Sequence, residues 1–239
     1  MIDKARFLIK SFDNVQYAKK FLMEGEMYFN CPAYFRYLAK RGELAKLNNN
    51  GEVIKNQFKG IGDFNEASIA WTIRVYQNIP IYCMYTVGNN DVKGNNVLLR
   101  KKAFDEFKSN NHKYFVVCEK EQFFNRIYSV FAGDGVFMFV SYEGVNPQSE
   151  EFYVSHMREA LFRKSLSYAH QQEFRIALAN DRINSKITYS NQSCEILLSD
   201  GQPYRGILRR VGDISAFSKI ISYEVLNCFD EKYYSFNIK

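Results

Sequence analysis

The hydrophobic pattern along the first part of the chain predicts strands that alternate with helices. Residues 6–12 and 79–87 are short apolar runs bounded by polar residues, which is typical of buried strands. Asp13 or Asn14 can cap a helix that ends before Gly25, where the chain can leave a helical conformation. The apolar stripe of this helix is spaced at the helical period: Val15, Ala18, Phe21 and Leu22.

Strand patterns dominate the last third of the chain, whereas helical patterns are concentrated in the first two thirds. Residues 101–109 and 123–131 have the pattern of amphipathic helices, and residues 157–164 have a weaker one. Short apolar segments that are typical of strands lie at 26–30, 114–118, 135–141, 174–179, 186–189, 195–198, 206–211 and 220–226. This distribution predicts an α+β fold with mixed, largely antiparallel sheets.

The chain carries no internal repeat and no low-complexity linker, so we expect a single domain over residues 1–239. Residues 41–60 and 87–94 are polar insertions that indicate loops. Residues 146–150 are the best candidate for a hinge, but a segment this short does not separate two domains comfortably.

The composition indicates a globular protein of a reducing compartment. A hydrophobic content of 46% and a charged content of 24% exclude a disordered chain. The sequence has no signal-peptide pattern and no apolar run of membrane-spanning length, so we expect a cytoplasmic protein with no membrane partner. The five cysteines have no close pair and no metal-binding spacing, so free thiols are expected at Cys31, Cys83, Cys118, Cys194 and Cys228.

Positive charge is concentrated in the first quarter of the chain. The net charge is +6, and residues 1–60 hold 11 basic against 6 acidic side chains. One interpretation is a surface that binds nucleic acid or an acidic protein; the other is an ordinary solvated face. Aromatic residues, at 16%, either pack in the core or stack on bases, and core packing is favoured. The candidate nucleic-acid-binding residues are Lys19, Lys20, Arg36, Lys40 and Arg41.

The common catalytic and metal-binding motifs are absent from the sequence. There is no glycine-rich phosphate loop, and His112 and His156 have no partner at ligand spacing, so no metal is expected. Asp63 and Glu66 lie on a turn, where they either cap the next helix or bind a divalent cation. A metal-dependent nuclease that uses these two carboxylates with Glu173 is therefore one of the hypotheses.

The most informative stretch precedes and enters an apolar strand at residues 161–178. In an extended chain Gln171, Glu173 and Arg175 share one face, while Phe174 and Ile176 point to the other. This pattern places an amide, a carboxylate and a guanidinium side by side. It predicts either a polar wall of a binding site or a Glu–Arg pair on a surface strand.

Three segments together resemble a prokaryotic family catalogued as domain of unknown function 2971. The segment GEMYFNCP at 25–32 matches the family's aromatic strand, and GDFNE at 62–66 echoes its acidic turn without the family's proline. Lys164 and the segment QQEFR at 171–175 match the pattern near the family's end. Gln171 departs from it, because the family has a glutamate there.

The order of these segments is more distantly similar to ADP-ribosyltransferases. That similarity implies that Glu173 is the catalytic carboxylate and Gln171 the acceptor-side residue, with NAD as the substrate. The residues implied to bind NAD are Lys10, as a phosphate-binding cation, Tyr28, Asn30 and Arg175. The family resemblance hints at a role in conflict between bacteria and phages. The alternative to an enzyme is a non-enzymatic, inhibitory module that binds nucleic acid or protein through the basic N-terminal face.

Overall fold

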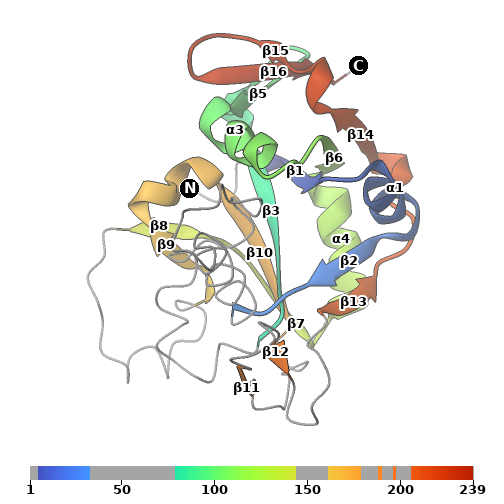
Figure 1. Ribbon diagram of the computed structural model, residues 1–239. Helices are drawn as coiled ribbons and strands as arrows, with labels where there is room; N and C mark the ends of the chain where they lie inside the picture. Colours follow the sequence, from blue (N-terminus) through green and yellow to red (C-terminus); the bar gives the residue numbers. More distant parts are fainter. Residues whose placement is uncertain are drawn as a thin grey trace, which may run out of the picture.

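A six-stranded sheet forms the centre of the molecule. The computed structural model describes residues 5–32, 79–143, 161–178, 188–189, 196–197 and 206–238. Every neighbouring pair in the sheet is antiparallel, which confirms the predicted α+β class with largely antiparallel sheets (Figure 1). In spatial order the strands are β14 (Ser218–Ser222), β6 (Tyr114–Glu119), β1 (Ala5–Phe12), β3 (Ile81–Gly88), β10 (Glu173–Leu178) and β7 (Gly135–Phe139).

Helices cover both faces of this sheet. Leu8 of β1 belongs to the hydrophobic core beneath α1 (Val15–Glu24) and α4 (Lys120–Phe131). Its neighbours Phe7 and Ile9 point the opposite way, into the core beneath α3 (Lys101–Ser109). The second core also takes side chains from a smaller sheet, whose order is β15 (Asn227–Cys228), β16 (Tyr233–Asn237), β5 (Asn96–Arg100) and β4 (Val92–Lys93).

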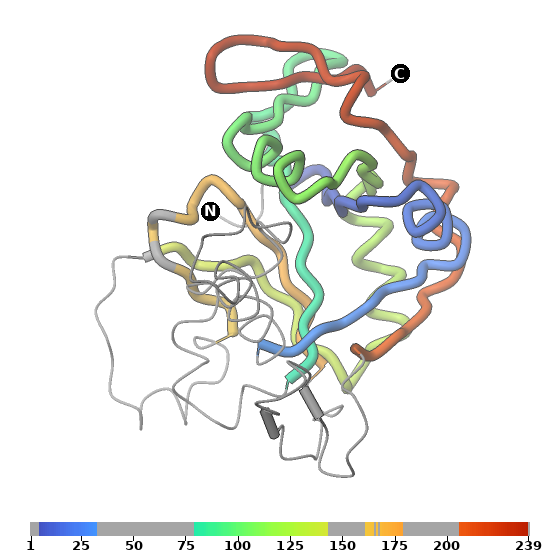
Figure 2. Tube along the Cα trace, viewed as in Figure 1, coloured from blue at the N-terminus to red at the C-terminus, as the bar shows by residue number. Residues whose placement is uncertain are grey.

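Helix α1 begins and ends where the sequence predicts. The Asn14 side chain accepts a hydrogen bond from the Gln16 backbone at 2.8 Å, which caps the first turn. Gly25 ends the helix with a φ of 62°, and a Cβ there would lie 2.4 Å from the Gly212 carbonyl oxygen. The chain then enters β2 (Glu26–Phe29), which pairs with β13 (Ile207–Arg210). Figure 2 shows these blue and red segments side by side, although they are far apart in sequence.

The connection into β10 differs from the sequence prediction. Residues 163–165 form β9 (Arg163–Ser165), which runs parallel to β8 (Ser141–Glu143), so the helix predicted over 157–164 is wrong at its end. A 3-10 helix follows at Leu166–Gln171, and Gln172 has a φ of 43°. Gln171 therefore lies before the strand rather than in it. The rest of that predicted helix, and the candidate hinge at 146–150, lie outside the described residues.

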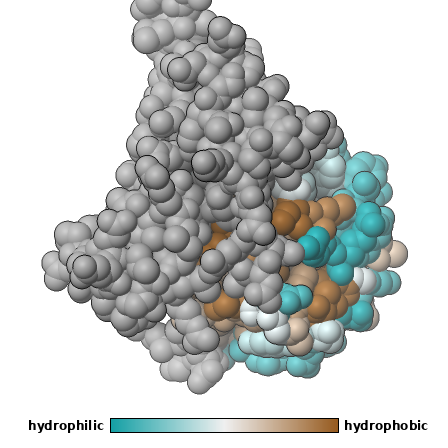
Figure 3. Space-filling model, turned by 90° about the horizontal axis from the view of Figure 1, so that it is seen from below, coloured by the Kyte–Doolittle hydropathy of each residue, from teal (hydrophilic) through white to brown (hydrophobic). Residues whose placement is uncertain are grey.

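Several strands were not predicted. The polar insertion at 87–94 leads through a 3-10 turn at Asn89–Asp91 into the β4–β5 hairpin, and β16 packs beside β5 near the end of the chain. Short elements complete the described fold: β11 (Thr188–Tyr189), β12 (Ile196–Leu197), and 3-10 turns at Ser215–Phe217 and Tyr223–Val225. Seen from below, hydrophobic residues of the described part gather toward the middle of the face and hydrophilic residues along its outer rim (Figure 3).

The described helices are all too short or too polar to span a lipid bilayer. Four of the five cysteines lie in described parts of the chain, and none of these four forms a disulfide, as expected: Cys31, Cys83, Cys118 and Cys228. Cys194 lies outside the described residues.

Candidate functional site

A cleft of about 270 Å³ opens where β1 and β3 stop pairing. The register between the two strands runs as far as Ile9 opposite Tyr85. Beyond this pair, the Lys10 side chain of β1 contacts β3 instead of its backbone. The Lys10 ammonium donates a hydrogen bond to the Cys83 carbonyl at 2.9 Å and lies 4.2 Å from the centre of the Tyr82 ring. The cleft is therefore bordered by parts of β1 and β3 that no longer pair with each other, although each still pairs with its other neighbour in the sheet, and the Lys10 charge is fixed between them.

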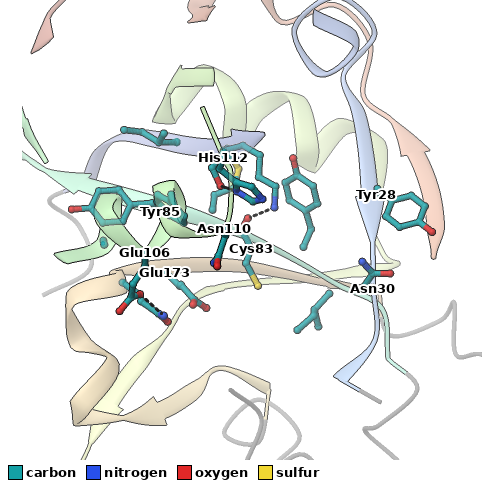
Figure 4. A pocket seen from close by; sticks show the side chains of 17 residues that line it. Tyr28, Asn30, Cys83, Tyr85, Glu106, Asn110, His112 and Glu173 are labelled. Atoms are coloured by element: carbon teal, nitrogen blue, oxygen red, sulfur yellow. Dashed lines mark hydrogen bonds between the residues drawn. The ribbon is translucent and has the colours of Figure 1, made fainter. Parts of the chain in front are cut away.

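Strand β2 supplies one side of the cleft. Met27 and Phe29 point into the core, so the alternation of the strand turns Tyr28 and Asn30 the other way. In Figure 4 Asn30 lies at the edge of the cleft, while the Tyr28 ring points away from it. The Tyr28 hydroxyl accepts a hydrogen bond from the Gly206 backbone at 2.6 Å. Asn30 is thus the better placed of the two to contact a ligand.

Glu173 lies at the opposite side, as the first residue of β10, and is 8% exposed. Lys164 approaches Oε1 at 2.7 Å, and the Nε and Nη2 atoms of Arg175 approach Oε2 at 2.8 Å. Burial raises the pKa of Glu173, but Arg175 and Lys164 outweigh this effect and lower it to about 2. Glu173 is therefore a fixed carboxylate anion that both neighbouring cations hold in place.

A chain of polar side chains extends from Glu173 across this side of the cleft. The Gln171 Oε1 atom accepts from Lys164, and its Nε2 donates to Glu106 Oε2 at 3.2 Å. The other oxygen of Glu106 lies 2.6 Å from His170 Nε2. Glu106 is carried by α3 and lines the cleft, with a side chain that is 40% exposed. Glu106 and Glu173 are both among the residues that line the cleft (Figure 4).

A histidine and a serine lie at the end of the cleft near Lys10. His112 Nδ1 is 2.8 Å from the Ser11 hydroxyl, and the ring stacks on Phe107. Burial, and then the positive charge of Lys10, lower the pKa of His112 to about 4. His112 is therefore neutral at neutral pH. It presents a hydrogen-bonding imidazole to the cleft without adding charge.

Three buried polar atoms of residues that line the cleft have no hydrogen-bond partner in the described part of the chain: Asn30 Oδ1, Asn110 Oδ1 and the Tyr82 hydroxyl. Each such buried group costs about 1–3 kcal/mol when it stays unpaired. Burial also raises the pKa of Tyr82, so its hydroxyl stays protonated. A polar ligand in the cleft would give these atoms partners.

The structure brings five of the residues predicted from the sequence into this one cleft: Lys10, Tyr28, Asn30, Gln171 and Glu173. Arg175, which the resemblance implies as a cofactor-binding residue, does not line the cleft: it is 2% exposed and binds Glu173 and the Leu161 carbonyl. Glu173 and Arg175 are two residues apart in β10 and therefore lie on the same face of the strand. The Arg175 guanidinium pairs with the buried Glu173 carboxylate there and does not reach the cleft.

The candidate nucleic-acid surface is only partly described. Lys19 and Lys20 are exposed on α1, and Lys20 lies 3.9 Å from Glu26. Three further members of that set and the two carboxylates of the acidic turn lie outside the described residues: Arg36, Lys40, Arg41, Asp63 and Glu66. The described residues contain no group of acidic, histidine or cysteine side chains that could hold a metal ion.

The cleft is also lined by polar residues that the sequence did not mark as site residues, among them Glu106, Asn110 and His112. Glu106 looked like an ordinary charge on a surface helix, and the other two lie in the polar turn after that helix. Their sequence distance from Glu173 leaves no local pattern that marks them. One signal was present, since His112 lies two residues before an apolar strand that pairs with β1.

Comparisons with models of known families, with characterised proteins and with solved structures find no match to this chain. The resemblance in the sequence therefore stays a prediction.

Proposed function

We propose that the cleft binds the nicotinamide riboside half of NAD and that the protein is an ADP-ribosyltransferase-like enzyme, which breaks the bond between nicotinamide and ribose. One observation carries this proposal. Lys10, Asn30 and Glu173, which come from three distant segments and to which the resemblance assigns roles toward NAD, line a single cleft. A cation, an amide and a carboxylate suit a ligand that combines phosphate, hydroxyl groups and a carboxamide.

The size of the cleft limits how much of NAD it can enclose. Ligand pockets usually measure about 300–1,000 Å³, and this cleft is slightly smaller, at about 270 Å³. It can therefore hold the nicotinamide riboside end, while the remainder of the dinucleotide extends beyond the described walls. The unpaired oxygen of Asn30 is an acceptor for the carboxamide N–H or a ribose hydroxyl.

Glu173 suits the ribose because of how its oxygens are occupied. A carboxylate has about four lone-pair positions. Arg175 makes two contacts with Oε2, whereas Lys164 makes one with Oε1. Oε1 can therefore accept a further hydrogen bond from a ribose hydroxyl. Two cations surround one anion here, so Glu173 acts as a directed acceptor at short range rather than as a long-range source of negative potential.

NAD consumption by Glu173→Gln tests this proposal. The amide keeps the size of the side chain but loses the charge, so we expect turnover to fall by about 10²–10³-fold, the usual cost of one well-placed electrostatic group. Release of nicotinamide is measured by chromatography. Glu26→Gln is the matched control, because Glu26 also pairs with two cations, Lys20 and Arg210, but lies outside the cleft.

A second variant protects the test against misfolding. Glu173→Gln removes the negative charge that Lys164 and Arg175 both contact, and breaking such a buried pair costs about 3–5 kcal/mol. Asn30→Ala disturbs no ion pair, and we expect it to weaken NAD binding about tenfold. Calorimetric titration with NAD measures this change. Absence of NAD binding and consumption in the wild-type protein would rule out the proposed function.

A further inference from the structure

We infer that Glu106, on helix α3, is the general base of the cleft, which takes a proton from the nucleophile that attacks the ribose. This inference rests on the proposed function and adds to it the class of acceptor: a neutral O–H group, either water or a hydroxyl, that must lose a proton. The observation behind it is that two carboxylates line the same cleft but have different partners: Glu173 contacts two cations, whereas Glu106 contacts a histidine and an amide.

Glu173 cannot take this role. Both of its oxygens contact cations, and its side chain is only 9% exposed. A proton on Oε2 would have to displace a contact with Arg175, and the remaining position on Oε1 is the one that the ribose hydroxyl takes in the proposed complex. The low pKa of Glu173, about 2, follows from the same contacts and makes it a weak base. A second group is needed wherever the reaction releases a proton.

Glu106 has the properties that Glu173 lacks. Its side chain is 40% exposed and lines the cleft, so a nucleophile can reach it. In the described part of the chain its carboxylate contacts no lysine or arginine; its partners are His170 Nε2 at 2.6 Å and Gln171 Nε2 at 3.2 Å. These contacts leave lone pairs on the carboxylate for an incoming proton.

Gln171 links Glu106 to the ion pair of Glu173. Its carbonyl oxygen accepts from Lys164, the partner of Glu173, so its amide nitrogen must point toward Glu106. An amide cannot act as a base, so Gln171 is a positioning residue that fixes Glu106 beside Glu173. His170 fixes the other oxygen of Glu106 in the same way.

The chemical step balances with this assignment. The bond between ribose C1′ and the nicotinamide nitrogen breaks, and nicotinamide leaves as a neutral molecule with the electron pair. The nucleophile oxygen forms a new bond to C1′, and its proton passes to Glu106 and then to solvent. Glu173 contacts the ribose throughout and exchanges no proton. General-base catalysis of this kind contributes about 10²–10⁴-fold to a rate.

Azide distinguishes the two carboxylates, because it is an anionic nucleophile that needs no base. We expect Glu106→Gln to slow NAD hydrolysis by water, and the corresponding reaction with methanol, by about 10²-fold or more. Added azide should restore nicotinamide release in this variant and yield ADP-ribosyl azide. In Glu173→Gln azide should restore nothing, since contact with the ribose is lost with either nucleophile.

Asp105→Asn is the matched control, because Asp105 is the adjacent carboxylate of α3 and contacts Tyr223 and Tyr234 outside the cleft. It should hydrolyse NAD at the wild-type rate. Glu106→Asp should keep part of the activity, because it keeps the base. Wild-type hydrolysis in Glu106→Gln, or a loss that azide does not reverse in a folded variant, would overturn the assignment of Glu106 alone. No NAD consumption by the wild-type protein would overturn the proposed function together with it.

Discussion

At the scale of single residues, the cleft combines one ionisable group that is kept charged with another that is kept neutral. Glu173 is held as an anion by Lys164 and Arg175, and His112 is held neutral by burial and by Lys10. Both groups have a pKa that differs from the value in an unfolded chain. The stability of the protein must therefore depend on pH through these two side chains.

His112 should make the protein less stable as pH falls from about 6.5 to about 4. In this window the unfolded chain binds a proton on His112 and the folded protein does not, so acid favours unfolding. The full difference in pKa corresponds to about 3 kcal/mol in the free energy of unfolding. Urea unfolding at a series of pH values measures this slope, and His112→Gln should flatten it.

Glu173 contributes in a lower window. Its pKa is lowered in the folded protein, so its stabilising effect is complete above about 4.5 and is lost as pH falls toward 2. A wild-type stability that stays constant between pH 6.5 and 4.5 would contradict the burial of His112, because Glu173 titrates only below that range.

At the scale of secondary-structure elements, the junction between α1 and β2 positions Asn30 at the cleft. Gly25 is required there for two reasons: its φ of 62° and the 2.4 Å approach that a Cβ would make to the Gly212 carbonyl oxygen. Gly133, after α4, has a φ of 88° but open space around a Cβ. A side chain at Gly133 would therefore meet only backbone strain, whereas a side chain at Gly25 would meet backbone strain and a steric clash.

Gly25→Ala should destabilise the protein more than Gly133→Ala does. Both substitutions carry the left-handed strain of about 1–2 kcal/mol, and only Gly25→Ala adds a clash with backbone. Thermal unfolding of the two variants measures the difference. Equal losses would mean that β13 moves away from the α1–β2 junction at no cost.

The sequence predicted the elements that depend on local patterns. The stripe of α1, its cap at Asn14 and the glycine at its end involve neighbouring residues, and α3 and α4 are amphipathic in the same way. Strand β9 was predicted as a helix because its partner β8 lies some 20 residues earlier in the chain. Strand β16 was missed because β5, which it pairs with, is more than 130 residues away. Neither strand pairing affects the spacing of hydrophobic residues within the strand itself, so the local sequence pattern does not show it.

At the scale of the whole molecule, the cleft exists because the central sheet opens between β1 and β3. Lys10, Asn30 and Glu173 were proposed as members of one site only through the family resemblance, and the structure shows that all three line the same cleft. Glu106 and His112 could not be predicted from the sequence, because only the packing of α3 and its following turn against β1 and β10 brings them to the cleft. A charge on a surface helix has the same appearance in sequence whether it faces solvent or a ligand.

The most direct test of the central claim is a crystal structure of the protein with a carba analogue of NAD, which binds but does not release nicotinamide. We predict electron density for the nicotinamide riboside half between Lys10 and Glu173. A ribose hydroxyl should lie within hydrogen-bonding distance of Glu173 Oε1, and the Asn30 oxygen should have gained a partner. An analogue bound elsewhere on the protein, or a cleft that holds only water at a saturating concentration of the analogue, would contradict the claim.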